Sequence, residues 1–512
     1  MMRDRVMGIE NEFGAVIESP DGSFDYLPTD GPYDTLVVGE TLNMQLEKQR
    51  DKLGFMRMKN RLWFPNGGCL YIDQGHFEYA SPECRRVRDI VAYSRAGEAL
   101  AEKVASERFY SGSRFRLIKN NVALSAATGM TEPVKTKYVT FGAHENYLFF
   151  ENGESGLFSS GPESEIKQGN YFRAFMAFLV TRQIIDGAGR WIDEPKNAYI
   201  FSQRALFIEK EFEMGTTGAR SIINKRSEHH IDDGSLDPPE HLKGMKRLHL
   251  ILGDANILDA ALFLKIGTTK LVLSLLEEGK MPNVKMRDPV KANRDVSLVY
   301  SPTTPCIELE DGTMVSAFYV QSAFYEKARH YLSHTCFESE ESEAEAKEIL
   351  SLWERALKAL ESTDMEWMVG RLDHVTKNFI AQQEIKRQRR ENPPVFEEAV
   401  VAAIEIQYHE LGDDALSSKM RAKWSSRCIV TDEEVLRAIE NPPPDTRACA
   451  RGLIVRAYLE KKIPLQDVDW SKIQIGTSPI GSVSGAQMYP VYQSPDPLIA
   501  RPSWLYEFCP GM

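Results

Sequence analysis

Residues 66–84 restrict the fold of this chain more than any other stretch, and they read NGGCLYIDQGHFEYASPEC. Apolar and polar side chains alternate over residues 69–73, which predicts a half-buried strand entered through the preceding Asn-Gly-Gly turn. Because successive side chains point to opposite faces of a strand, Cys69, Tyr71 and Asp73 share one face. The strand must therefore bury one side and present a phenol and a carboxylate on the other.

More oxygen and nitrogen ligands follow this strand within ten residues, namely His76, Glu78, Tyr79 and Glu83. Together with Asp73 they could coordinate a hard cation through oxygen and leave one carboxylate as a base or nucleophile. A strand end whose acids face water is the alternative explanation.

Residues 6–18 repeat the pattern, because apolar residues there alternate with Glu10 and Glu12. Two carboxylates on one face of a strand repel each other, and the repulsion grows when they are buried. A cation beside them would relieve it. Gly8 and Gly14 flank the pair and let another group approach closely. A solvent-facing polar edge is the competing interpretation.

The composition is that of an ordinary globular protein, with 42% hydrophobic and 27% charged residues. A net charge of −12 argues against a nucleic-acid-binding surface. The apolar runs are too short to span a bilayer, and the start of the chain has no apolar signal core. The seven cysteines form no Cys-x-x-Cys pair, which favours a reducing cytoplasm without disulfides or zinc. We therefore expect a cytoplasmic protein that binds neither nucleic acid nor a membrane.

Periodicity predicts the remaining elements in outline. We expect strands at residues 115–121, 138–150 and 247–254, with short arginine-ending strands near Arg204 and Arg226. Helices are expected at residues 41–52, 88–107, 170–186, 256–278, 338–358 and 396–409, and a small unit begins near residue 448. The segments 125–137 and 227–242 have the composition of loops.

Many short motifs, in this order, resemble those of the enzymes that attach or remove the prokaryotic ubiquitin-like protein Pup. The matching segments are MGIENEFG (7–14), NG (66–67), LYID (70–73), His76, EY (78–79), PEC (82–84), KNN (119–121), HENY (144–147), SQR (202–204), IIN (222–224), RLH (247–249), GDAN (253–256), PP (442–443), TRA (446–448) and RG (451–452). They span nearly the whole chain, and their shared order makes the resemblance specific.

The resemblance implies an α+β fold: a glutamine-synthetase-like curved, mainly antiparallel sheet with packed helices. It also implies a catalytic domain over residues 1–430 and a small C-terminal domain over residues 431–512. The implied cofactors are ATP and Mg²⁺, and the implied partners are Pup, or a similar modifier, and its lysine-conjugated protein substrates.

The resemblance also assigns roles to residues of this chain. Glu10, Tyr71 and Glu78 would hold magnesium, with Glu12 as a further candidate. Asp73 would be the catalytic carboxylate. The remaining two positions, Ser81 and Trp470, would contact the nucleotide.

One position departs from the family pattern. The family usually has an arginine that helps to bind ATP where this chain has Cys69. A thiol cannot supply that charge. Either Arg204 or Arg226 compensates, or nucleotide binding is altered.

The family contains two opposite activities. A ligase phosphorylates the modifier's C-terminal glutamate and joins it to a lysine, whereas a deamidase or depupylase hydrolyses the amide or isopeptide bond. The segments 8–14 and 64–67 are more similar to those of the ligase, whereas the short spacing from Asp73 to Glu78 is more similar to that of the depupylase. Because Asp73 is the expected catalytic residue, this spacing decides the choice: depupylase is the preferred prediction and ligase the alternative. A small-molecule carboxylate–amine ligase and a non-catalytic modifier-binding protein are the other hypotheses.

Overall fold

The computed structural model describes residues 4–26, 54–58, 61–73, 76–107, 112–119, 122–124, 138–150, 170–192, 198–214, 220–224, 245–391, 397–476, 481–483, 486–488, 490–494 and 496–509. Four sequence-based predictions lie outside these residues: Arg226, the helix at 41–52 and the loops at 125–137 and 227–242.

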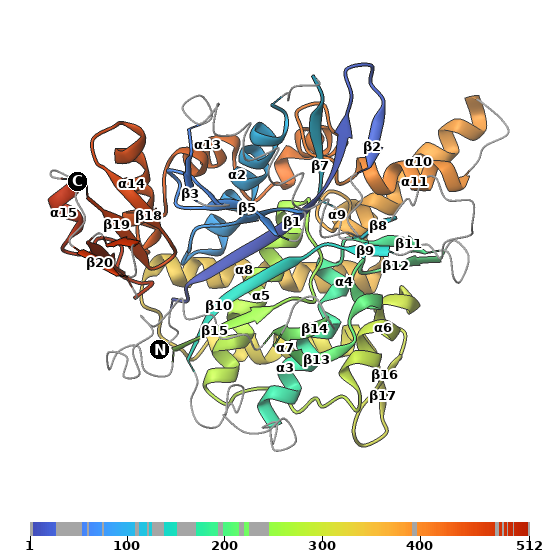
Figure 1. Cartoon of the computed structure of the whole chain (residues 1–512). Helices are drawn as coiled ribbons and strands as arrows, with labels where there is room; N and C mark the ends of the chain where they lie inside the picture. The colour runs from blue at the N-terminus through green and yellow to red at the C-terminus, as the bar shows by residue number, and fades with distance from the viewer. Residues whose placement is uncertain are drawn as a thin grey trace.

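An eleven-stranded sheet forms the centre of the described structure (Figure 1). Its strands run in the order β13-β14-β15-β10-β1-β6-β5-β4-β3, and β2 and β7 pair with the far half of β1. All described pairs in it are antiparallel except β13 with β14, so the predicted α+β, mainly antiparallel architecture is confirmed. The strands are β1 (Met7–Glu18), β2 (Phe24–Tyr26), β3 (Met56–Met58), β4 (Arg61–Trp63), β5 (Cys69–Asp73), β6 (His76–Ala80), β7 (Arg114–Ile118), β10 (Ala143–Phe150), β13 (Lys210–Glu213), β14 (Ser221–Asn224) and β15 (Met245–Leu250).

The two faces of β1 have opposite character, as its alternation predicts. Met7, Ile9 and Phe13 are buried on one face, while Glu10 and Glu12 lie on the other, half-buried. Burial of each large apolar side chain stabilises the fold by about 1.5–3 kcal/mol. The apolar face of β1 therefore packs against the core. The carboxylates are thereby fixed on the opposite face of the sheet.

Helices cover the apolar face of the sheet. The main core combines residues of α2, α3 and α5 with the apolar side chains of β1, β10 and β15. The helices are α2 (Val87–Ala105), α3 (Asn170–Thr181), α4 (Gln183–Asp186), α5 (Asp259–Glu277), α6 (Pro289–Val299), α7 (Ala317–Leu332), α8 (Glu340–Ser362), α9 (Met365–Met368), α10 (Asp373–Glu391), α11 (Glu397–Gln407), α12 (Leu416–Lys423) and α13 (Asp432–Glu440). No helix of the described residues is long and apolar enough to cross a membrane.

Most predicted elements are present with shifted ends. The strand predicted at 138–150 is interrupted: β9 (Tyr138–Thr140) pairs with β8 (Val122–Leu124), and β10 begins at Ala143. The strand predicted at 247–254 ends at Leu250, and the next six residues are irregular because they lead into α5. Two further hairpins, β11 (Arg190–Ile192) with β12 (Ala198–Ile200) and β16 (Ile307–Glu308) with β17 (Met314–Val315), lie apart from the main sheet.

The C-terminal elements lie at one end of the molecule, beside the early strands β3 and β5 (Figure 1). They are α14 (Ala448–Leu459), β18 (Leu465–Val468), β19 (Lys472–Ile475), β20 (Gly481–Val483), β21 (Ala486–Met488), β22 (Val491–Gln493) and α15 (Leu505–Phe508). A shared core joins Met56 and Trp63 to apolar residues of α14, β18 and β19. A Cβ atom on Gly452 would lie 2.3 Å from the carbonyl oxygen of Pro65, so only glycine permits this approach. The division of the chain at residue 430 stays a prediction.

Candidate active site

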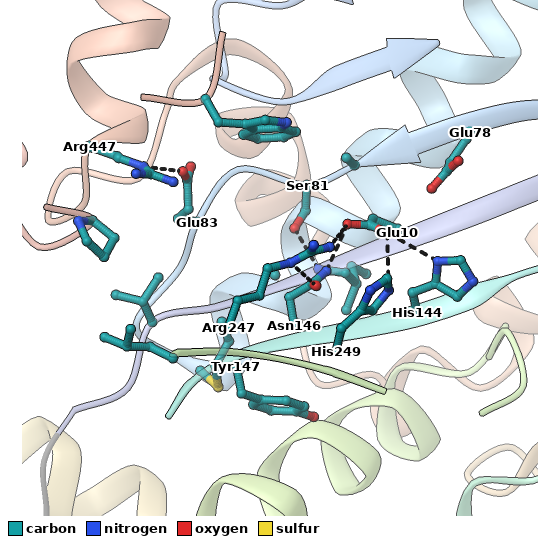
Figure 2. Close-up of a pocket in the computed structure, with 18 of the residues that line it drawn as sticks. Glu10, Glu78, Ser81, Glu83, His144, Asn146, Tyr147, Arg247, His249 and Arg447 are labelled. Atoms are coloured by element: carbon teal, nitrogen blue, oxygen red, sulfur yellow. Dashed lines mark hydrogen bonds and ion pairs between the residues drawn. The ribbon is translucent and has the colours of Figure 1, made fainter. Parts of the chain in front are cut away.

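A cavity of about 310 Å³ opens on the polar face of the sheet. It is lined by Val6, Met7, Gly8, Ile9, Glu10, Arg61, Tyr71, Asp73, Glu78, Ala80, Ser81, Glu83, His144, Asn146, Tyr147, Leu148, Arg247, His249, Arg447, Trp470 and Pro497. Figure 2 shows the labelled residues converging from several strands and from the C-terminal elements. Five of the predicted site residues in the first strands, Glu10, Tyr71, Asp73, Glu78 and Ser81, therefore share one cavity with Trp470.

Glu10 lies at the centre of this cavity because β1 runs between β10 and β6. Its Cα pairs with His144 on β10 and with Ala80 on β6. Asn146 Nδ2 and Arg247 Nη2 each donate to Glu10 Oε1 at 3.0 Å. The ring nitrogens of His144 and His249 lie 3.2 and 3.7 Å from the other carboxylate oxygen (Figure 2).

These neighbours decide the charge of Glu10. Burial opposes ionisation, but Arg247, His144 and His249 outweigh it and hold the pKa of the Glu10 carboxyl well below its usual range. Glu10 is therefore an ionised carboxylate fixed in position by donors from two other strands.

A second group of acids lies on the same face and is here called the acidic cluster: Glu12, Asp73 and Glu78. Glu12 pairs with Glu78 across β1 and β6, and one carboxylate oxygen from each of the three lies within 4.8 Å of the others. Burial, followed by repulsion from Glu10, Glu12 and Asp73, raises the pKa of Glu78 well above its usual value. Tyr71 on β5 pairs with Glu78 on β6, and their side chains are hydrogen-bonded. Burial and the Glu78 carboxylate raise the pKa of the Tyr71 phenol.

The donor set fits a divalent cation. Burial and then repulsion from the neighbouring acids raise the pKa of Glu78, and a cation at the acidic cluster would offset that repulsion. Carboxylate oxygens are the hard ligands that Mg²⁺ takes, and the Tyr71 phenol lies beside them. Glu10 with His144 and His249 forms a further group of three donors within the same distance limit.

Ser81 and Trp470 reach the cavity from different directions. Ser81 Oγ accepts from the Ile9 backbone N–H at 3.0 Å and donates to the Pro82 carbonyl at 3.0 Å, which anchors it beside β1. Trp470 follows β18, and its ring centroid lies 5.0 Å from that of Trp63. The Arg451 guanidinium lies 4.7 Å from the Trp470 ring and 5.4 Å from the Trp63 ring, so it contacts both aromatic rings.

Glu83 belongs to this C-terminal junction and not to the acidic cluster. It accepts from Arg447 Nε at 2.7 Å and also pairs with Arg451. Burial would raise its pKa, but the two guanidinium groups lower it to about 2. The Tyr79 phenol is also remote, because it is buried on the helix-covered side, where Asn66 Nδ2 donates to it at 3.2 Å. Neither residue joins the metal-ligand group that their position in sequence had suggested.

Arg204, predicted to compensate for Cys69, does not line the cavity. It is buried, its guanidinium donates to the Phe141 carbonyl, and burial lowers its pKa to about 10 despite the nearby Glu12. Cys69 is itself buried in the core shared with α14, and burial raises the pKa of its thiol. Arg226 lies outside the described residues.

Three arginines that were not predicted as site residues do line the cavity: Arg61, Arg247 and Arg447. His144, Asn146 and His249 also line it, although the sequence places them only in the motifs HENY and RLH that resemble those of the family. The available signal was period-two spacing, because His144 and Asn146, and likewise Arg247 and His249, stand two residues apart and share a strand face.

The mainly antiparallel sheet carries acids, histidines and arginines on one face and is backed by helices on the other, as the resemblance to the Pup-modifying enzymes implies. The chain belongs to the Pup-ligase protein family, whose model matches residues 5–474. It is 30% identical to the Pup–protein ligase of Xylanimonas cellulosilytica, over 93% of this chain and 94% of that protein. It is 31% identical to the Pup–protein ligase of Mycolicibacterium smegmatis, again over 93% and 94%.

Solved structures agree with this assignment. A complex between Pup and its ligase PafA matches with a TM-score of 0.77 and 27% identity, covering 99% of this chain and 92% of that one. The ligase PafA in complex with ADP matches with a TM-score of 0.70 and 27% identity, covering 93% of each chain. The predicted family is confirmed.

Proposed function

We propose that this protein is an ATP-dependent ligase that joins Pup, or a closely similar modifier, to lysine side chains of other proteins. The observation that carries the proposal is the match to the Pup-ligase model over residues 5–474, with the carboxylate-lined cavity inside that span. Relatives that cover the chain nearly end to end carry the name Pup–protein ligase.

The cavity offers a place for each reactant. Glu10, Tyr71 and Glu78, with Glu12 as a further ligand, would hold Mg²⁺, which supplies charge neutralisation for a transferring phosphoryl group. Trp470 offers an aromatic face to the base of ATP, and Ser81 offers a hydroxyl at the β1 edge. The similar ligase PafA has been solved in complex with ADP, which supports nucleotide binding by this protein.

Asp73 would act as the base of the second step. The modifier's glutamate carboxylate attacks the γ-phosphorus of ATP, which gives an acyl phosphate and ADP. A lysine amine then attacks the acyl carbon, phosphate leaves, and Asp73 takes the amine proton. Asp73 suits this role because it is half-buried at the end of β5 and lines the cavity. Such general-base catalysis contributes about 10²–10⁴-fold in rate.

The comparisons support the ligase alternative better than the preferred depupylase prediction. That preference depended on the short spacing between Asp73 and Glu78. In the structure Asp73 pairs with His76 at the end of the β5–β6 ladder, and Glu78 still faces Tyr71. The short spacing therefore still leaves Asp73, Glu78 and Tyr71 together at the cavity.

A gel assay separates the two directions. We expect purified protein with ATP, Mg²⁺ and a modifier ending in glutamate to form new conjugates with a lysine-bearing protein. A fluorescent modifier–lysine isopeptide conjugate serves as the matched substrate for hydrolysis. Release of free modifier from that conjugate, without ligation under the first conditions, would overturn the ligase proposal in favour of depupylase.

A further inference from the structure

Arg61 is a cationic side chain of the cavity that the proposed mechanism does not use. It lies on β4 (Arg61–Trp63), directly across from Tyr71 on β5. Its guanidinium lies 6.0 Å from the Tyr71 ring centroid, and its Nη1 is 2.8 Å from Asp469 Oδ1. Arg61 therefore bridges the acidic part of the cavity and the segment that carries Trp470.

We propose that Arg61 is the cavity's mobile phosphate ligand, which leaves Asp469 to contact the polyphosphate of the bound nucleotide. This inference rests on the proposed function, because it presumes that the cavity takes a nucleoside triphosphate. Arg61 would supply the positive charge that the buried Cys69 thiol does not provide. Cys69 lies on β5 two residues before Tyr71, the residue opposite Arg61.

The other arginines that line the cavity are themselves largely buried and are held by carboxylates. Arg247 donates to Glu10 and, at 2.7 Å, to Asn146 Oδ1, and its side chain is 11% exposed. Arg447 donates to Glu83 and is 5% exposed. Breaking either pair would separate a largely buried guanidinium from its carboxylate, which costs about 3–5 kcal/mol. Both groups are therefore fixed parts of the cavity wall.

The ion pair of Arg61 is different in kind. Its two side chains are 38% and 53% exposed, and an exposed pair of this type contributes only about 0–1 kcal/mol. Asp469 Oδ1 also accepts from the Trp470 backbone N–H at 2.8 Å, so it keeps a donor and water when Arg61 departs. A phosphate can accept two hydrogen bonds from the Arg61 guanidinium. Arg61 therefore gains by leaving the Asp469 carboxylate for a phosphate.

The surrounding charge favours a role at the phosphates. Glu10 and the acidic cluster give this face of the sheet a negative field, and a triphosphate adds to it. Arg61 lies beside Tyr71, one of the proposed metal ligands, and on the side of the cavity that leads to Trp470. A nucleotide whose base contacts Trp470 would extend its phosphates past Arg61 toward the metal ligands.

The test is calorimetric binding of ATP·Mg²⁺ to the full chain. We expect Arg61→Gln to weaken binding about tenfold or more, because a hydrogen bond to a charged group is lost. The loss should shrink as salt is raised, because salt screens the contact. Asp469→Asn should bind at least as tightly as the wild type. Arg57→Gln is the matched control, since Arg57 is a half-buried arginine on neighbouring β3 that does not line the cavity.

Two results would overturn the inference. One is equal ATP affinity in Arg61→Gln and the wild type. The other is an Asp469→Asn variant as weak as Arg61→Gln, which would mean that the ion pair only supports the fold. A wild-type protein that does not bind ATP·Mg²⁺ at all would instead contradict the proposed function, so the two failures are distinguishable.

Discussion

Glu10 shows how much of this site depends on single side chains. One carboxylate accepts from Asn146 and Arg247 through one oxygen and faces His144 and His249 with the other. These donors favour the ionisation of Glu10, whereas burial and then the neighbouring acids raise the pKa of Glu78 on the adjacent strand. The pKa values of two glutamates on neighbouring strands are thus shifted in opposite directions. Glu10 is held as an anion by its donors, whereas a bound cation would favour the ionisation of Glu78.

Asp73→Asn should slow turnover strongly and leave nucleotide binding intact. Asparagine keeps the shape of the side chain but cannot take a proton, so we expect conjugate formation to fall about 10²-fold or more. Loss of one negative charge beside Glu78 also relieves repulsion, so the fold should persist. The rate of conjugate formation and the ATP affinity are the two measurements.

Glu18→Gln is the control for this prediction. Glu18 also lies on β1, but it pairs with Arg114 and Arg116 away from the cavity. Its turnover should equal that of the wild type. Full activity in Asp73→Asn would remove Asp73 from the mechanism.

The residues of the site could be predicted where their own strand carried the signal. Glu10, Tyr71, Asp73 and Glu78 stand out because acids or a phenol alternate with apolar residues within one strand. Arg61 could not be found in this way. It reaches the cavity because β4 pairs with β5 in a register that places it opposite Tyr71, and sequence spacing does not encode that pairing.

At the scale of elements, β1 organises the sheet because it pairs with four other strands. Its first half pairs with β10 and β6, and its second half with β2 and β7. The alternation that predicted this strand and the apolar pattern that predicted α5 are both local signals, and both elements are confirmed. The strand order is not local, since β10 and β15 come from residues more than 130 positions later.

Glu83 connects the end of β6 to α14, and its protonation should weaken that connection. Its pKa is about 2 in the folded protein against an ordinary value of 4.5, so ionised Glu83 stabilises the fold. This contribution is complete above pH 4.5 and is lost as the pH falls from 4.5 toward 2. By linkage it amounts to about 3 kcal/mol.

Glu83→Gln isolates this contribution. The free energy of unfolding, measured with denaturant, should be lower than that of the wild type by about 3–5 kcal/mol at pH 7, because two buried guanidinium groups lose their carboxylate. The difference should narrow below pH 4.5. Glu434→Gln changes another carboxylate held by an arginine, at the more exposed Arg88 pair, and should cost less. A difference that is constant with pH would contradict the assignment.

At the scale of the whole molecule, the C-terminal elements help to line the cavity and share a core with the early strands. Trp63 of β4 is fully buried in a cluster that includes residues of α14, β18 and β19. Trp470 and Arg447, from the same part of the chain, line the cavity. Nucleotide binding and the attachment of these elements are therefore expected to depend on each other.

Removal of residues 431–512 should expose Trp63 and abolish ATP binding, with aggregation seen by size-exclusion chromatography. Loss of packing around one buried tryptophan alone costs about 3–5 kcal/mol. Gly452→Val in the full chain tests the same coupling without truncation, because a Cβ there would lie 2.3 Å from the Pro65 carbonyl oxygen and displace α14.

We expect Gly452→Val to lower both the melting temperature and the ATP affinity. Leu436→Ser is the control, since Leu436 is 60% exposed on α13 and should change neither. A soluble chain of residues 1–430 with wild-type ATP affinity would show that the cavity is complete without the C-terminal elements.

The close approach of Trp63 and Trp470 affects how the protein absorbs ultraviolet light. Two indole rings whose centroids lie 5.0 Å apart absorb as a coupled pair, and the chain has seven tryptophans in all. Trp63 is fully buried in the core, and Trp470 lines the cavity. A molecule that enters the cavity therefore changes the surroundings of one chromophore only. The protein carries its own unlabelled reporter, and near-ultraviolet circular dichroism could follow occupancy of the cavity in real time.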